Sequence, residues 1–253
     1  AFAAMEPPTD YTPEHIRSEK VKVIDALVPT PVDRVAEFCS LGQYGPDGKD
    51  DPGFAASEGV APGSTTETFA ALELQFQNWR WAGTPFYLRS GKRMAKKRTE
   101  VVVQFKPPAA NLFRKLPAFA AGDHLEPNRL VFTVAPNEQL SLRFETKRPG
   151  LGIHIDPLEM MADVGASFDA PVVEAYGPLM IDAMRGDQTL FKSRTEVESA
   201  WDAVMPFLGE SSAAARAGIR DNYQPGSWGP ESSKALLARK GRRWYEDGVA
   251  DGS

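Results

Sequence analysis

Alternating hydrophobic and polar positions mark the middle of the chain as a series of strands. Leu72, Leu74 and Phe76 fall on one face of an extended segment, while Glu73 and Gln75 fall on the other. Short apolar runs separated by brief polar links continue this pattern, which is typical of an antiparallel meander. The expected strands cover residues 72–76, 84–88, 101–105, 130–134 and 140–144.

Helical spacing of apolar residues appears before and after these strands. Thr12 is a candidate cap, with Pro13 at the first helical position of the first helix. The expected helices cover residues 13–27, 170–184, 196–207 and 231–239, with a loop at 45–64 and a strand-like aromatic end at 243–246. The apolar side of the second helix comprises Val173, Tyr176, Leu179, Met180 and Met184. This order predicts an α+β fold, a large mostly antiparallel sheet with helices packed on one face.

The length favours one domain over residues 1–253, with a helical entry and loop at 1–64, the antiparallel sheet at 65–165, and helices and the C-terminal end at 166–253. Cys39 is the single cysteine, which excludes an internal disulfide and a cysteine-based zinc site, fits a cytoplasmic protein and leaves no metal implied. No apolar run approaches the roughly 18 residues of a membrane span. The start at Ala1, without methionine, is what a truncated chain would show.

A basic cluster stands out because the whole chain has a net charge of −5. Six cations lie within ten residues: Arg89, Lys92, Arg93, Lys96, Lys97 and Arg98. They follow the strand at 84–88 and precede the strand at 101–105, so they lie at a connection where a phosphate or another anion can bind. The alternative is a solvated charged turn. The acidic balance of the rest of the chain argues against general nucleic-acid binding.

The residues around the cluster resemble the glucose-6-phosphate dehydrogenase family. Residues 80–92, RWAGTPFYLRSGK, match its segment RW.G.PF..R.GK, and similar text continues in family order along essentially the whole chain. The further matches are at 4–7, 19–23, 42–45, 63–71, 128–131, 136–138, 174–176 and 226–230. The resemblance is to the C-terminal domain, in a form like the bacterial one.

The resemblance implies oxidation of glucose 6-phosphate to 6-phosphoglucono-1,5-lactone with NADP, the first step of the pentose phosphate pathway. In the family the nucleotide fingerprint, the motif HYLGK and the histidine taken as the general base precede the matched segment, and this chain contains none of them. The chain alone is therefore expected to be inactive, with no catalytic residue assigned. A homodimer through the sheet is also expected.

The resemblance assigns substrate binding to Lys92 and Lys97, at the two basic positions that help to hold the sugar phosphate. Lys96 and Arg98 are neighbours that can take the place of Lys97. Some family members bind a second, structural NADP, and Arg89 and Arg98 lie where two of its contacts fall. Arginines expected elsewhere in that site are replaced by Pro127, Pro178 and Trp228, which argues against the site, and the cofactor-binding residues are left unassigned.

The remaining polar residues carry less specific expectations. His124 and His154 are expected to be a solvated and a strand histidine rather than bases, and Asp50, Asp51 and Glu58 to be solvated loop charges. Two other functions stay open: a non-catalytic paralogue that binds a sugar phosphate or pairs with a full-length enzyme, and an anion-binding module that meets nucleic acid or an acidic protein.

Overall fold

The computed structural model describes residues 1–108, 110, 113, 115, 125–168 and 176–246. It divides into two compact units, which are described separately. The first unit comprises Ala1–Lys96 and Ala175–Ser253, and the second comprises Lys97–Glu174. The assignment of residues 1–253 to one domain stays a prediction.

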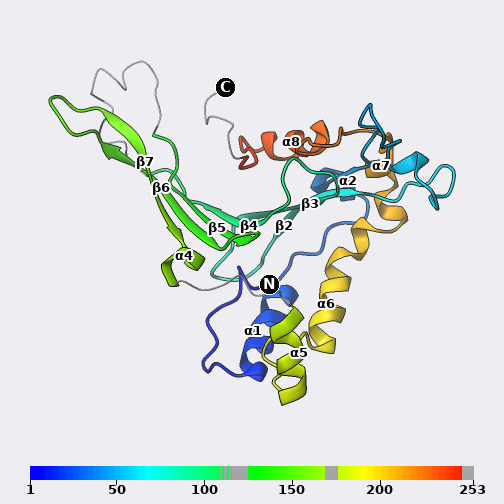
Figure 1. The fold of residues 1–253 in the computed structure, drawn as a ribbon, viewed down its shortest axis with the longest axis horizontal. Helices are drawn as coiled ribbons and strands as arrows, with labels where there is room; N and C mark the ends of the chain where they lie inside the picture. Colours follow the sequence, from blue (N-terminus) through cyan, green and yellow to red (C-terminus); the bar gives the residue numbers. More distant parts are fainter. Residues whose placement is uncertain (109, 111–112, 114, 116–124, 169–175, 247–253) are drawn as a thin grey trace. The chain divides into compact units, whose positions relative to one another are not determined.

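A three-stranded antiparallel sheet in the order β1-β2-β3 forms the centre of the first unit (Figure 1). Its strands are β1 Cys39–Gly42, β2 Phe69–Gln75 and β3 Pro85–Gly91. The α-helices of this unit are α1 Pro13–Asp25, α2 Val35–Phe38, α5 Tyr176–Arg185, α6 Arg194–Val204, α7 Ala213–Arg216 and α8 Glu231–Ala238. Three short 3-10 turns, η1 Phe54–Ala56, η2 Met205–Phe207 and η3 Glu210–Ser212, complete it.

Helical elements cover both faces of the three-stranded sheet. Phe69 of β2 packs in one buried cluster with Leu236 and Leu237 of α8. Leu72, which points to the opposite face of β2, packs in another cluster with Val35 of α2 and Phe207 of η2. This differs from the expectation of helices on one face, because a sequence period shows which positions are apolar but not how many layers bury them.

The second unit contains a four-stranded antiparallel sheet in the order β4-β5-β6-β7. Its elements are β4 Thr99–Gln104, β5 Arg129–Ala135, β6 Gln139–Lys147, β7 Ile155–Asp163 and the short helix α4 Val164–Phe168. The α+β class and the antiparallel pairing are confirmed. The expected single large sheet is present as two hydrogen-bonded sheets, with β3 and β4 in different ones.

One face of the four-stranded sheet is apolar from edge to edge. The register aligns Val103, Leu130, Leu142 and Met160, and the next row on that face aligns Val101, Phe132, Leu140 and Ala162. These eight residues define the apolar face of the second unit. The opposite face carries the polar row Gln104, Arg129, Arg143 and Glu159 and the mixed row Val102, Val131, Ser141 and Met161, which lies between the two apolar rows. This confirms the alternation predicted for residues 140–144.

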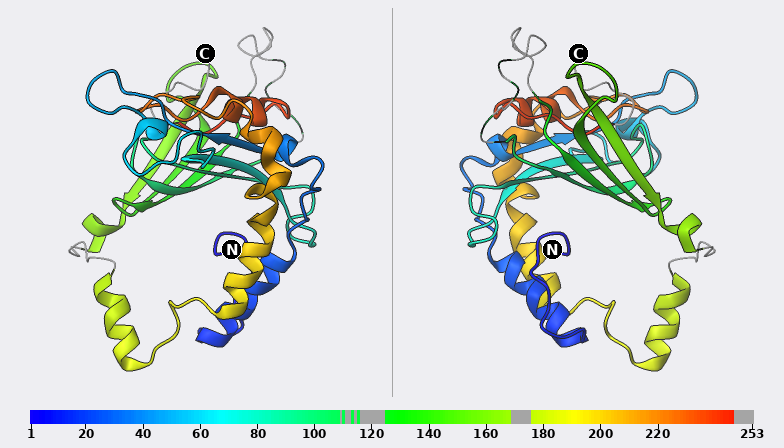
Figure 2. Two further views of the ribbon diagram at one scale, coloured as in Figure 1. Left: turned by 90° about the vertical axis from the view of Figure 1, so that its right-hand side faces the viewer. Right: turned by 90° about the vertical axis from the view of Figure 1, so that its left-hand side faces the viewer.

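The packing of the two helices expected to cover the sheet, at residues 170–184 and 196–207, differs from the prediction. α6 packs against α1 instead, and Figure 2 shows the two side by side. A buried ion pair joins them, with Lys20 Nζ 3.7 Å from an oxygen of Glu196. Of the predicted apolar side of residues 170–184, Tyr176, Met180 and Met184 are exposed.

Three other details correct or complete the predictions. Val173 lies outside the described residues, so only part of the second predicted helix is observed, as α5. The aromatic end at 243–246 forms no strand, because Trp244 packs against Tyr87 and donates its Nε1–H to Ser233 O at 3.0 Å. Within the described part of the chain, no helix has the length and apolarity needed to cross a membrane.

Candidate functional site

Arg89 lies within β3, and the other five cations of the basic cluster lie, as predicted, in the connection that follows this strand. β3 ends at Gly91, which pairs with Phe69, and β4 begins at Thr99. A Cβ atom at residue 91 would lie 2.8 Å from both the Met94 sulfur and the Phe69 ring. Glycine therefore lets the chain pass close to the core immediately before Lys92.

The backbone at Lys92 is held on both sides of its α-carbon. Its N–H donates to Thr68 O at 2.8 Å, and its carbonyl oxygen lies 2.9 Å from the hydroxyl of Tyr223. The next residue, Arg93, has a φ of 52°, a left-handed conformation that is strained for a bulky side chain. Its carbonyl accepts the N–H of Gly226 at 2.8 Å. The connection therefore has a fixed conformation that the segment around residue 226 supports.

Three arginines of the cluster are paired with carboxylates of the chain. Arg89 lies 2.9 Å from Glu246, and its guanidinium is also stacked between the rings of Trp228 and Trp244. Arg93 lies 2.5 Å from Asp51, and Arg98 lies 3.0 Å from Glu100. The charge of these arginines is compensated locally, which indicates a structural role.

Lys92 and Lys97 differ from these arginines. Both side chains are exposed, and within the described residues neither ammonium has a hydrogen bond or an ion pair. Lys96, in contrast, takes part in an interaction of its own. Lys92 belongs to the first unit, and Lys97 is the first residue of the second. The two lysines named from the resemblance are thus the cations of the cluster that keep an uncompensated charge.

The residues near Arg89 and Arg98 do not fit a second, structural nucleotide. A phosphate on either guanidinium would stand beside Glu246 or Glu100, which repel it. Trp228, which stands where an arginine is expected in the forms that carry the site, covers Arg89 with its ring.

The two described histidines, His15 and His154, make no hydrogen bond or ion pair with the connection between β3 and β4. His15 is exposed at the start of α1, where its Nδ1 lies 2.8 Å from the Thr12 hydroxyl. His154 is exposed just before β7 and only its backbone carbonyl makes a hydrogen bond within the described residues, to the N–H of Arg148. His124 lies outside the described residues. A groove along α1 and residues 188–195 is lined by none of the clustered cations.

Sequence reasoning missed three residues that shape the site. Asp51 was expected to be a solvated loop charge, but its side chain is largely buried and holds Arg93. Thr68 and Tyr223 hold the backbone of Lys92. Their contacts to the connection span 24 to 131 positions of sequence, so no local pattern reports them.

Comparison with known proteins gives a consistent result. The family model "Glucose-6-phosphate dehydrogenase, C-terminal domain" matches residues 1–245. The glucose-6-phosphate 1-dehydrogenase of Mycolicibacterium smegmatis is 40% identical over 246 residues, which is 96% of this chain and 48% of the relative. The Bacillus subtilis protein of the same name is 39% identical over 248 residues, covering 97% of this chain and 49% of the relative. The chain thus spans about half the length of these relatives.

Solved structures agree with the sequence relatives. A glucose-6-phosphate dehydrogenase in complex with its substrate glucose 6-phosphate superimposes with a TM-score of 0.79 at 29% identity, covering 96% of this chain and 48% of that one. The enzyme from Mycobacterium avium gives a TM-score of 0.75 at 29% identity, covering 97% of this chain and 47% of that one.

Proposed function

The chain belongs to the glucose-6-phosphate dehydrogenase family as its C-terminal domain, and from this premise we propose that it completes the substrate site of an NADP-dependent glucose-6-phosphate dehydrogenase. The reaction oxidises the C1 hydroxyl of glucose 6-phosphate to the 1,5-lactone, and NADP accepts the hydride. No step is assigned to a nucleotide site in this chain, because its sequence has no dinucleotide fingerprint. The single cysteine, buried as a free thiol, supports a reducing cytoplasm as the location.

The observation that carries the proposal is the exposed, uncompensated ammonium of Lys92 on a fixed backbone. A lysine binds a phosphate dianion as a point charge on a flexible stem, and charge-assisted hydrogen bonds of this kind are stronger than neutral ones. A fixed α-carbon lowers the entropy lost when such a stem closes on its ligand. Lys92 is therefore proposed to bind the sugar phosphate.

Lys97 is proposed as the second phosphate ligand. Its ammonium, like that of Lys92, has no partner among the residues that the structure describes. Arg98 next to it is engaged by Glu100, and this favours Lys97 over its neighbour.

The test is the selectivity of the full-length enzyme for a phosphorylated sugar. Lys92→Ala should lower kcat/KM for glucose 6-phosphate by about 10- to 150-fold, because a hydrogen bond to a charged group contributes about 1.5–3 kcal/mol. Activity toward glucose, which has no phosphate, should change by less than about twofold. Lys49→Ala, which removes an exposed lysine from the 45–64 loop, is the matched control. An equal loss with both sugars would contradict phosphate binding by Lys92.

We further propose that a second copy of the chain covers the apolar face of the second unit. Phe132, Leu140 and Met160 are exposed on it, and the eight residues that define this face carry no charge. A two-fold axis brings like surface against like surface, so an uncharged apolar face is complementary to its own copy. The opposite face mixes Val102, Val131 and Met161 with the charged Arg129, Arg143 and Glu159, and is less suited to such a contact.

A further inference from the structure

We infer that Tyr223 is a positioning residue for Lys92: its hydroxyl fixes the Lys92 carbonyl and so determines where the ammonium meets the phosphate. This inference rests on the proposed function of Lys92. Tyr223 lies 131 positions from Lys92 in the sequence, within the first unit.

The ring of Tyr223 is held in the core, with 4% of the residue exposed. It packs against Phe69 with a centroid distance of 5.6 Å and meets Tyr44 edge-on at 6.4 Å. This packing leaves the hydroxyl in one position. Burial also raises the pKa of Tyr223, so the hydroxyl keeps its proton at neutral pH and remains a donor.

The hydroxyl joins the end of β3 to the residue before β2. It lies 2.9 Å from Lys92 O, 3.2 Å from Thr68 O and 2.9 Å from the Thr68 hydroxyl. A phenol has a single proton; donated to the nearer carbonyl, Lys92 O, it leaves the Tyr223 oxygen as an acceptor for the Thr68 hydroxyl. Thr68 O also accepts the N–H of Lys92. The two backbone polar groups of Lys92 therefore both depend on the Tyr223–Thr68 pair.

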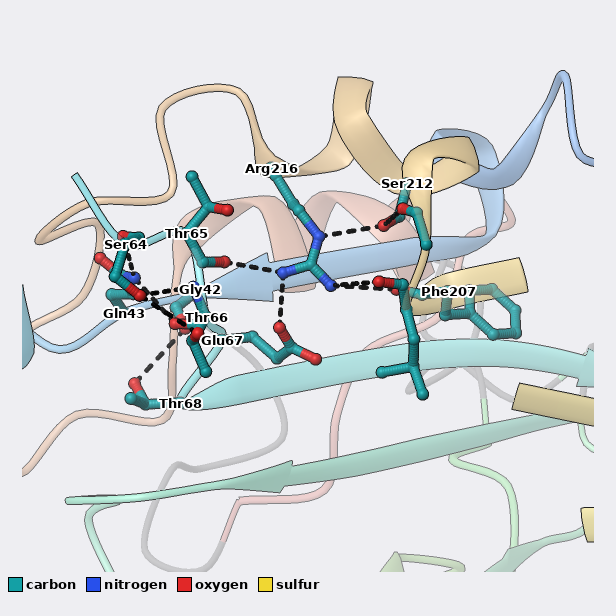
Figure 3. Close-up of polar contacts among 12 residues, drawn as sticks. Gly42, Gln43, Ser64, Thr65, Thr66, Glu67, Thr68, Phe207, Ser212 and Arg216 are labelled. Carbon is teal, nitrogen blue, oxygen red and sulfur yellow. Dashed lines mark hydrogen bonds and ion pairs between the residues drawn. The ribbon is translucent and has the colours of Figure 1, made fainter. Parts of the chain in front are cut away.

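Residues 64–68 are themselves anchored, so this pair cannot follow a displaced connection. Figure 3 shows Arg216 donating to Glu67 at 2.5 Å and to Thr65 O at 2.7 Å. On the other side, the amide of Gln43 donates to Ser64 O and Thr66 O at 2.9 and 2.7 Å. The Tyr223 hydroxyl thus links the backbone of Lys92 to a segment that is itself held in place.

The experiment uses Tyr223→Phe in the full-length enzyme, since this change keeps the packed ring and removes only the hydroxyl. Misplacement of a binding group by about 1 Å can cost up to a hundredfold, so we expect kcat/KM for glucose 6-phosphate to fall by about 5- to 30-fold. Activity toward glucose should stay within about twofold. Tyr44→Phe is the matched control, because it removes a neighbouring phenol whose hydroxyl makes no hydrogen bond within the described residues.

The double variant separates positioning from a general structural role. In a Lys92→Ala background, Tyr223→Phe should have no further effect on kcat/KM, because the ammonium that it positions is gone. Multiplicative losses, equal losses with both sugars, or no loss would each overturn the inference. If the Lys92→Ala single variant keeps its selectivity, the proposed function fails, and the inference fails with it. Should Tyr223→Phe not fold, Thr68→Ala removes the partner hydroxyl and must show the same sugar-dependent loss.

Discussion

The two sheets are built alike and buried differently. Both are antiparallel, but the three-stranded sheet of the first unit is packed between α8 on one face and α2 and η2 on the other. Among the described residues of the second unit, Val131 is the one buried apolar side chain, at 5% exposure, while Phe132 and Met160 on the apolar face are 43% and 58% exposed.

This difference in burial separates apolar residues that stabilise the fold from apolar residues that are available to contact another molecule. In the first unit, a large buried side chain contributes transfer free energy and fills space that nothing else can fill. In the second unit, an equally apolar side chain has been left in contact with water. A continuous exposed apolar surface of this kind marks an interaction site more often than a defect.

Two phenylalanines, Phe69 of β2 in the first unit and Phe132 of β5 in the second, measure this difference in burial directly. Phe69→Ala should lower the free energy of unfolding by about 3–5 kcal/mol, because Phe69 is 1% exposed and its removal leaves a cavity beside Tyr223. Phe132→Ala should cost less than about 1 kcal/mol in the monomer, because its side chain is already partly hydrated. Urea unfolding at low protein concentration measures both.

The protein concentration at which the two variants are unfolded distinguishes their effects. If a second copy covers Phe132, the loss from Phe132→Ala should grow as the protein concentration rises, whereas the loss from Phe69→Ala should not. Equal losses for the two variants at low concentration would show that the second unit is buried as thoroughly as the first.

Adjacent methionines of β7 test which face of the second unit receives the partner. Met160 belongs to the apolar face, and Met161 pairs with Ser141 on the opposite one. Met160→Lys should weaken self-association by at least about a hundredfold, about 2.7 kcal/mol, because each copy would bury an unpaired charge. Met161→Lys should leave association unchanged, because the Met161 side chain is 67% exposed and lies on the opposite face. Analytical ultracentrifugation reports the dissociation constants.

This pair is matched in residue type, strand and exposure, and differs only in the direction of the side chain. A Met160→Lys chain that associates as tightly as the parent would exclude the apolar face as the interface. Loss of association in Met161→Lys alone would place the interface on the opposite face of the sheet.

The elements were predictable from the sequence where local chemistry decides them. The Thr12 cap fixed the start of α1, since its side chain accepts the N–H of His15, and the period of two located β2 and β6. The division into two sheets was not predictable, because β3 and β4 are adjacent in sequence and both apolar, and only tertiary pairing separates them. β1 and β7 were missed.

The site shows the same limit. Lys92 was named as a phosphate ligand, which stays a prediction, because its local sequence is specific; its place at a connection follows from the flanking strands. Lys92 differs from Arg93 in its partners: Arg93 pairs with Asp51, whereas the Lys92 ammonium pairs with no described residue. This difference depends on a loop 42 positions away from Arg93. Tyr223 gave no signal, since a tyrosine that packs in a core and one that holds a backbone carbonyl look alike in sequence.

Thiol chemistry provides a smaller, kinetic test of the same contrast. Cys39 lies in the core of the first unit with 6% exposure, and burial raises the pKa of its thiol from 9.0 to about 11. The thiolate fraction at pH 8 is then about a hundredfold lower than for an exposed cysteine, so a disulfide reagent such as dithiobis(nitrobenzoate) should react at least that much more slowly. Met161→Cys places a second thiol on the exposed strand of the other unit.

Labelling of the Met161→Cys chain should therefore be biphasic, with a fast phase from the second unit and a slow phase limited by opening of the first. The sign of the pH dependence follows from the raised pKa. Because the folded state holds the Cys39 proton more tightly, the thiol's contribution to stability is full below pH 9 and is lost as the pH rises through about 11. Over that range the parent should lose more stability than Cys39→Ala, and the slow phase should accelerate. A single fast phase would mean that the core around Cys39 opens as readily as the exposed sheet, which would remove the contrast between the two units.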